Sequence, residues 1–349
     1  MTANVNASAD DLTKEPFYLP PRDFVGYGLE SPEDCWPNGK KIAVSFVLNY
    51  EEGAEHSLWN GDDMSCNNLH ELHYERQTVY GKRDCMTESM FEYGIRQGLP
   101  RLLKLFREFG WQWTTWACAR AFETSGDYPK MLVEDGHEIA CHGNRWRIHG
   151  TNSAQEKAHI NKSFDRLQAS TGLPNVPTGW FLGNGSIRQK LVRAQVHKER
   201  GIPLLYCSDT YAGDVPYYIP NPLAEVYGEK DDGMLMIPYS LCTNDHRFIV
   251  AGGAGVAAPE DFFELLKGEF DGLYAEGLAG RPKMMTIAMH NRMVGKPGRI
   301  MALRRFMEYI RDVPDVWVCT RSEIARHWRE KYPYEEVGAT FKLHNEHLR

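Results

Sequence analysis

Short apolar segments alternate with longer amphipathic segments along the chain, and this alternation limits the possible folds more than any other feature. Segments that read as buried strands cover residues 41–49, 111–119, 137–143, 177–184, 203–210, 233–240, 283–290 and 316–320. Segments that read as helices lie between and after them, at 100–110, 128–136, 153–172, 186–201, 259–277, 302–312 and 322–333. Strands that alternate with helices usually pair in parallel, so the pattern predicts an α/β fold with a largely parallel sheet.

Polar residues gather where several of these strands end. The stretches NYEEG, CHGNRW, GNGS, CSDTY and AMHNR each follow an apolar run. In (β/α) barrels the loops at the carboxyl ends of the strands carry the chemistry. We therefore predict a barrel of this kind, with an open doubly wound sheet as the alternative.

The overall charge and the lengths of the apolar runs argue against several classes of function. The net charge is −7 and the isoelectric point is near 6.0, whereas nucleic acid or an anionic membrane would need a basic face. The longest apolar runs, such as residues 42–48, are far shorter than the roughly 20 residues of a membrane span. We expect a disordered tail over residues 1–19 and one catalytic domain over 20–349. The start lacks a signal-peptide pattern, so a cytoplasmic protein is expected.

Eight cysteines are scattered along the chain without a CxxC pair. Several lie inside apolar runs, as in TTWACARAF and VWVCT. This distribution favours free, buried and unreactive thiols over a disulfide framework or a structural zinc site.

Two adjacent carboxylates, Glu51 and Glu52, follow the first strand directly. On spacing alone they fit a solvated turn before a glycine. Their place at a strand end also fits a catalytic pair, because crowded carboxylates repel and the pKa of one of them can rise toward neutrality. A carboxylate with such a pKa can act as a general base.

Two histidines also stand at predicted strand ends. His142 ends the strand EIAC, where it could cap the barrel wall or bind a metal, but Trp146 stands four residues later, where a second ligand would be expected. His290 ends another strand and is followed closely by Arg292. We predict a catalytic centre that consists of His142, His290 and Arg292 together with the two glutamates.

Candidate substrate contacts come from the remaining strand ends. They are Trp146, Asn184, Asp209, Tyr211, Asn244 and Asp245, although the stretch TNDHR that holds the last two also fits a plain polar turn. The chain contains no GxGxxG, P-loop or GxSxG motif, which argues against dinucleotide, nucleoside triphosphate and serine-hydrolase chemistry.

Seven stretches occur in a characteristic order: PRDFVGYGLESPEDCWPNGKKIAVSFVLNYEEG, GHEIACHGNRW, PTGWFLG, SDTYAGDVPYY, PYSLCTNDHRF, MHNRMVGKPGR and SEIARHW. Together they resemble the metal-independent, PuuE-type allantoinases, which belong to the NodB-homology polysaccharide deacetylase superfamily. The resemblance covers residues 20–332 and implies a distorted (β/α)7 barrel with its active site at the strand ends. It also implies a homo-oligomer, with a tetramer as the suspected state.

The resemblance assigns roles to individual positions. Metal-dependent members carry an aspartate pair, one base and one metal ligand, where this chain has Glu51 and Glu52. They carry two histidine ligands four residues apart, which match His142 and Trp146. The PuuE-type enzymes share both departures, so the resemblance implies a centre without a tightly bound metal. Allantoinases have an arginine at Asn184 and an acidic residue at Cys242, so the substrate stays open among allantoin, imides, hydantoins and acetamido compounds.

These residues suggest the hydrolysis of a cyclic amide or ureide, a small-molecule substrate. Glu51, with Glu52 beside it, would take a proton from water, and Arg292 or a protonated His142 or His290 would stabilise the oxyanion and protonate the leaving nitrogen. One alternative is a metal-dependent N-deacetylase that uses Glu52 and His142, with His149 or His290 completing the metal site. A second is a binding module that has kept the barrel without the chemistry.

Overall fold

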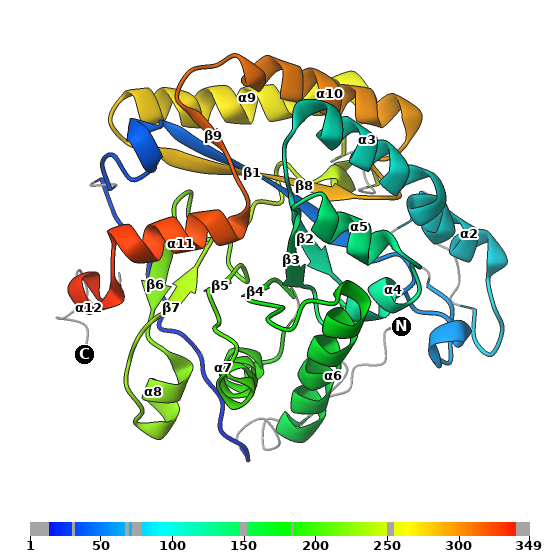
Figure 1. The fold of residues 1–349 in the computed structure, drawn as a ribbon, viewed down its shortest axis with the longest axis horizontal. Helices are drawn as coiled ribbons and strands as arrows, with labels where there is room; N and C mark the ends of the chain where they lie inside the picture. Colours follow the sequence, from blue (N-terminus) through cyan, green and yellow to red (C-terminus); the bar gives the residue numbers. More distant parts are fainter. Residues whose placement is uncertain are drawn as a thin grey trace.

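Nine strands form one curved sheet in the computed structural model, which describes residues 14–29, 32–66, 70–71, 79–146, 152–182, 185–249 and 255–339 (Figure 1). The strand order is β6-β7-β5-β4-β3-β2-β1-β8, and β9 pairs with β1 as well. The strands are β1 (Ile42–Tyr50), β2 (Thr114–Ala117), β3 (Glu138–Cys141), β4 (Gly179–Trp180), β5 (Tyr206–Cys207), β6 (Tyr217–Ile219), β7 (Met234–Met236), β8 (Lys283–His290) and β9 (Val316–Val318).

The sheet is parallel except at one edge and curls until its two edges meet. β6 pairs with β7 in the antiparallel direction, and every other pairing is parallel. The Met284 and Ala288 amides of β8 donate to the carbonyls of Asp214 and Thr243, which come from the β6–β7 side. The predicted distorted (β/α)7 barrel is thus confirmed, and the open doubly wound sheet is wrong.

Helices cover the outside of the barrel, with α3, α9 and α10 together on one side and α6 and α7 on another (Figure 1). The larger ones are α2 (Cys85–Tyr93), α3 (Leu99–Phe109), α5 (Tyr128–Glu134), α6 (Ser153–Thr171), α7 (Gln189–Arg200), α9 (Pro259–Leu278), α10 (Pro297–Arg311) and α11 (Arg321–Lys331). Short ones are η1 (Pro37–Gly39), η2 (Leu58–Asn60), α4 (Ala119–Glu123), α8 (Pro222–Tyr227), η4 (Asp245–Phe248) and α12 (Tyr334–Val337). A π-helical turn, η3 (Gly94–Gly98), joins α2 to α3.

Local sequence signals set the ends of the predicted helices. α3 and α6 stop at Gly110 and Gly172, whose φ angles of 65° and 75° are left-handed and therefore favour glycine. Asn152 caps the start of α6, and Thr320 and Glu323 form a capping box at the start of α11. All the strands and helices predicted from the sequence are present, whereas β6, α2, α4, α8 and α12 were not predicted.

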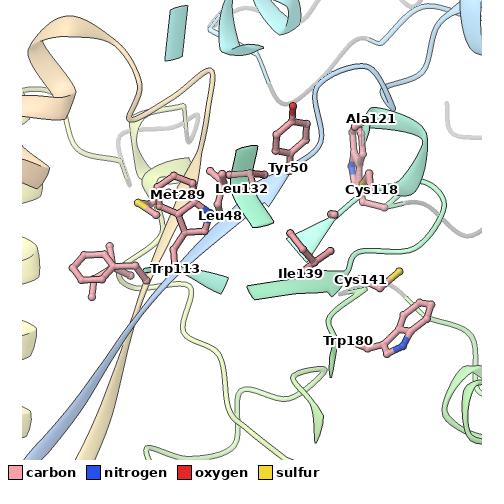
Figure 2. Close-up of a cluster of buried hydrophobic side chains, with 14 of the residues drawn as sticks. Leu48, Tyr50, Trp113, Cys118, Ala121, Leu132, Ile139, Cys141, Trp180 and Met289 are labelled. Carbon is pink, nitrogen blue, oxygen red and sulfur yellow. The ribbon is translucent and has the colours of Figure 1, made fainter. Parts of the chain in front are cut away.

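The core lies on both sides of β1, whose nine residues are all buried. Figure 2 shows part of one cluster, in which Leu48 and Tyr50 of β1 lie near Trp113, Ile139 and Met289. A strand buried on both faces reads as a continuous apolar run, which is why residues 42–48 show no alternation. The rigid strand ends then hold the polar residues that follow them.

The N-terminal boundary lies earlier than the sequence indicated. Residues 14–19 were expected to belong to a disordered tail, but Tyr18 is 5% exposed and its hydroxyl donates to the Pro220 carbonyl. Glu15 accepts hydrogen bonds from the amide and hydroxyl of Ser153 at 2.7 Å. Residues 1–13 lie outside the described residues.

Two further predictions concern cysteines and membranes. All eight cysteines are free, and six are buried as predicted, but Cys85 and Cys242 are exposed. Within the described ranges, none of the helices combines the length and the apolar character needed to cross a bilayer.

Candidate active site

Glu51 lies at the centre of a buried polar cluster that three strand ends bring together. It follows β1 directly, His142 follows β3, and His290 ends β8. Glu51 Oε1 lies 3.4 Å from His142 Nε2 and 3.7 Å from His290 Nε2, and all three residues are buried. The structure therefore brings together three of the five predicted catalytic residues around a single carboxylate oxygen.

A hydrogen-bonded carboxylate holds His290 in place. Its Nδ1–H donates to Asp245 Oδ1 at 2.6 Å, and its main-chain amide donates to Asp245 Oδ2 at 2.7 Å. Burial opposes a charge on the ring, but the carboxylates of Asp245 and Glu51 together raise the pKa of His290 to about 9. At neutral pH His290 is thus a cation whose Nε2–H points toward Glu51.

Arg292 ties Glu51 to Glu52. Its guanidinium donates to Glu51 Oε2 at 2.8 Å and to Glu52 Oε1 at 3.1 Å, and it lies over the Phe91 ring. Although burial opposes the charge of Glu51, Arg292 and His290 hold its pKa well below the usual range. The rise in pKa expected from the carboxylate pair is therefore wrong for Glu51, because two cations outweigh the effect of burial.

Glu52 lies on the opposite side of the chain from Glu51. It accepts hydrogen bonds from the Arg292 amide at 3.0 Å and from Asn291 Nδ2 at 2.9 Å. The π-helical turn packs against it so closely that a Cβ atom on Gly94 would lie 2.8 Å from Glu52 Oε1. These contacts make Glu52 a buried anchor for Arg292 and Asn291.

The hydrogen bonds of His142 indicate which of its ring nitrogens carries a proton. Nδ1 lies 2.6 Å from the Phe181 carbonyl, which can only accept, so Nδ1 carries a hydrogen. Nε2 then faces Glu51 Oε1. The ring is stacked on Phe181, with 5.3 Å between the ring centroids and 13° between the planes. These contacts fix the ring and aim Nε2 at the centre.

Two of the residues predicted to bind substrate have carboxylates that accept hydrogen bonds from the protein itself. Asp245 is fully buried, and its two oxygens are used by His290 and by the Val294 amide. Asp209 accepts from the Leu182 amide and from Arg193, each at 2.7 Å. For both aspartates neighbouring donors already bind the carboxylate, and the predicted substrate contact stays a prediction.

The other predicted substrate contacts differ in how accessible they are. The Asn244 side chain is buried, accepts from the His246 amide at 2.8 Å and donates to the Tyr239 hydroxyl at 2.5 Å. Tyr211 is 54% exposed and lies beside Tyr239. Trp146 is 7% exposed and packs in the main hydrophobic cluster. Asn184 lies outside the described residues.

His246 is the main residue of the site that the sequence reasoning missed. Its ring is stacked on that of His290, with the centroids 4.1 Å apart and the planes at 13°. Burial and the positive charge of His290 lower its pKa well below the usual range, so this ring is neutral. The stretch TNDHR stood among the strand-end clusters, so its position was a usable signal, but the candidates chosen within it were Asn244 and Asp245.

Glu55 is a second residue near the site that the sequence reasoning missed. Burial raises the pKa of Glu55 to about 7, and the Gly53 amide donates to it at 2.6 Å. Together with Glu52 and Glu88 it lines a cavity of about 370 Å³ beside α2. The elevated carboxyl pKa expected near residue 51 is found four residues further along the chain.

One group in the described part of the chain is compact enough to suggest a metal site: Glu51, His246 and His290, whose ligand atoms lie within 4.8 Å of one another. A metal ion lies in the plane of each imidazole that binds it, about 2.0–2.1 Å from the nitrogen for zinc. Two rings stacked at 13° have nearly parallel, separate planes, so one ion cannot lie in both. Arg292 adds a positive charge next to Glu51. This arrangement does not fit a tightly held ion.

The metal pair considered from the sequence, Glu52 with His142, is not brought together. Glu51, not Glu52, faces His142, while Glu52 is held by Arg292 and Asn291. His149, another residue considered for that site, lies outside the described residues.

Comparisons with known proteins agree with this fold. The sequence model of the polysaccharide deacetylase family matches residues 82–202. A Schizosaccharomyces pombe protein described as a "Putative polysaccharide deacetylase" is 40% identical over 317 residues, 90% of this chain and 98% of its own. The crystal structure of PuuE allantoinase has a TM-score of 0.80 and 42% identity, over 91% of this chain and 100% of its own. That of a "probable Polysaccharide deacetylase" from Pseudomonas aeruginosa PAO1 has a TM-score of 0.79 and 41% identity, over 90% and 99%.

Proposed function

The chain belongs to the polysaccharide deacetylase family, and from this premise we propose that it opens cyclic amides or ureides with a water activated at Glu51, without a tightly bound metal. The protein is a hydrolase of carbon–nitrogen bonds other than peptide bonds. The similarity to PuuE allantoinase over nearly the whole chain supports a small cyclic substrate over a polysaccharide.

The observation that carries the proposal is the pairing of an anionic Glu51 with a cationic His290. Their reactive atoms, Oε1 and Nε2, lie 3.7 Å apart, with His142 Nε2 on the same oxygen. A water placed beside these two atoms could accept a hydrogen bond from His290 and donate one to Glu51. Hydrolysis needs both a proton acceptor and a proton donor, and this cluster contains both.

In the reaction that we propose, Glu51 takes a proton as water attacks the carbonyl carbon of the ring. The charge that develops on the carbonyl oxygen lies near the positive ring of His290, and such electrostatic stabilisation lowers the barrier. His290 then gives the proton on Nε2 to the ring nitrogen as the C–N bond breaks. Water thereby adds across the bond and leaves a carboxylic acid and a free nitrogen group.

Arg292 acts in this scheme as a positioning residue. Its donors are held by the two glutamates, so it fixes Glu51 and keeps that carboxylate ionised. A carboxylate with so low a pKa is a weak base, and this favours activated carbonyls, such as those of imides and ureides, over unactivated acetamides. His142 completes the cluster by aiming Nε2 at the carboxylate oxygen that takes the proton.

The test compares the wild-type enzyme with Glu51→Gln and His142→Ala after exhaustive chelation, with succinimide, hydantoin, allantoin and an N-acetyl sugar as substrates. We expect the chelated wild type to open one or more of the cyclic compounds, and Glu51→Gln to lose about 10²–10⁴ in kcat, the usual size of losing a proton-transfer group. Near-normal turnover by both variants would show that the proposed centre is wrong.

Metal analysis of the purified protein tests the alternative. A stoichiometric ion whose removal abolishes deacetylation of the N-acetyl sugar would favour the metal-dependent deacetylase. The cytoplasmic location and the homo-oligomer remain expectations, which cell fractionation and sedimentation would test.

A further inference from the structure

His246 presents an unused ring nitrogen at the reactive centre. A ring nitrogen of His246, a carboxylate oxygen of Glu51 and a ring nitrogen of His290 all lie within 4.8 Å of one another. The Nε2 atom of His246 is buried and has no hydrogen-bond partner among the residues that the structure describes. A buried polar atom without a partner is unfavourable, so a partner supplied by a bound substrate would remove this cost.

Stacking on His290 keeps His246 able to accept a hydrogen bond. The two rings lie 4.1 Å apart and nearly parallel, and a proton on His246 would place two positive rings face to face. Burial adds to this effect and lowers the pKa of His246 well below its usual range. A neutral imidazole has one N–H and one lone pair, whereas an imidazolium has only donors. His246 can thus accept where His290 donates.

One substrate nitrogen can lie between the two rings although one metal ion cannot, because a hydrogen bond tolerates a larger departure from the ring plane than a metal–nitrogen bond does. Two partners that each lie about 2.9 Å from one nitrogen, at a tetrahedral angle, are separated by about 4.7 Å. The ring nitrogens of His246 and His290 lie no further apart than 4.8 Å. A leaving ring nitrogen carries one N–H bond and one lone pair, which match an acceptor and a donor on adjacent rings.

We propose that His246 accepts a hydrogen bond from the N–H of the substrate ring nitrogen, at the same atom that His290 protonates as the C–N bond breaks. The inference rests on the proposed function and narrows its substrate class to rings with a free N–H at the scissile bond. Holding that N–H in place turns the nitrogen lone pair toward His290. The nitrogen leaves with two hydrogens, one that it carried and one from His290, while Glu51 holds the proton of the attacking water.

The experiment measures kcat and KM for succinimide and N-methylsuccinimide with wild type, His246→Met and His246→Gln. Methionine fills the space without a nitrogen acceptor, and the amide oxygen of glutamine can still accept. We expect wild type to favour succinimide by about tenfold in kcat/KM, the size of one net hydrogen bond. His246→Met should bring that ratio close to one, mainly through kcat on succinimide, and His246→Gln should keep part of the preference.

The outcomes separate the inference from the proposed function. If wild type hydrolyses neither compound nor any other cyclic amide or ureide, the proposed function fails before His246 is tested. If wild type hydrolyses both imides equally well, or if a folded His246→Met keeps the full preference, the inference is overturned and the hydrolase stands. Should His246→Met not fold, the comparison of wild type with His246→Gln decides: a preference reduced in part supports an acceptor at this position, and an unchanged or larger preference refutes the role of the imidazole.

Discussion

Replacing Asp245 with asparagine should shift the basic limb of the pH–rate profile toward lower pH. His290 is surrounded by Glu51 after β1, by Asp245 and His246 in η4, by Arg292 in its own loop and, farther away, by His142 after β3. Burial disfavours its charge, while the carboxylates of Asp245 and Glu51 favour it and raise its pKa to about 9. Wild-type kcat/KM should therefore fall as the pH rises through about 9, where His290 loses its proton.

The size of the effect follows from the two pKa values. At pH 7.5 a histidine with a pKa of about 9 is about 97% protonated, whereas at the ordinary value of about 6.5 it is about 10% protonated. Loss of the proton alone thus removes about tenfold in rate at pH 7.5.

The assay is a pH scan of kcat/KM from 5 to 10 with a ring amide whose own N–H does not ionise in that range. Asp209→Asn is the matched control, because it removes another largely buried carboxylate, which pairs with Arg193 and does not touch His290. The control should keep its basic limb near pH 9, whatever its rate. A limb that stays near 9 in a folded Asp245→Asn would refute the view that this carboxylate keeps His290 charged.

Two predictions concern folding. Gly98→Ala should destabilise the protein by more than about 1 kcal/mol, because a Cβ there would lie 1.9 Å from the Asn291 carbonyl oxygen. Gly272→Ala in α9, with open space around it, should stabilise the protein by about 0.5–1 kcal/mol. Urea unfolding measures both, and a stabilised Gly98→Ala would contradict the packing described for η3. The neutral His197 ring accepts from Trp180 and donates to the Ile202 carbonyl, and burial lowers its pKa to about 4. As the pH falls, the unfolded chain takes up a proton on His197 before the folded protein does. The stability that the neutral ring contributes is therefore complete above pH 6.5, falls as the pH drops toward 4 and amounts to roughly 3 kcal/mol. In urea unfolding at pH 7, 5 and 4, His197→Asn should lose less of its free energy of unfolding on acidification than wild type.

The fold and the centre of the site could be predicted because the sequence marks where the strands lie and where they end. The alternation of strands and helices indicates a parallel barrel, and parallel strands place their carboxyl ends at one rim. Glu51, His142 and His290 each stand at or directly after such an end, so the structure brings them together. The short strand β6 carries only three paired residues, and such brief pairing leaves little periodicity in the sequence.

The direction in which each side chain points could not be read from spacing. Glu51 and Glu52 are neighbours in sequence and share Arg292, but only Glu51 faces the two histidines, while Glu52 faces Asn291. Only the contacts that fold around them decide which carboxylate can react. The same reason explains why Asp245 was taken as a substrate contact: its partner, His290, lies 45 residues further along the chain.

The charges at the centre also bear on what kind of substrate it can bind. Glu51, Glu52 and Asp245 supply three negative charges, and Arg292 and His290 supply two positive ones, all of them buried and mutually paired. An added ion would find few unpaired partners there and would lose its hydration, which is costly in a buried site. A neutral ring brings no such cost, and its reaction only moves charge, because Glu51 becomes neutral as the carbonyl oxygen becomes negative. The charge balance of the cluster thus favours a neutral cyclic amide over an anionic substrate.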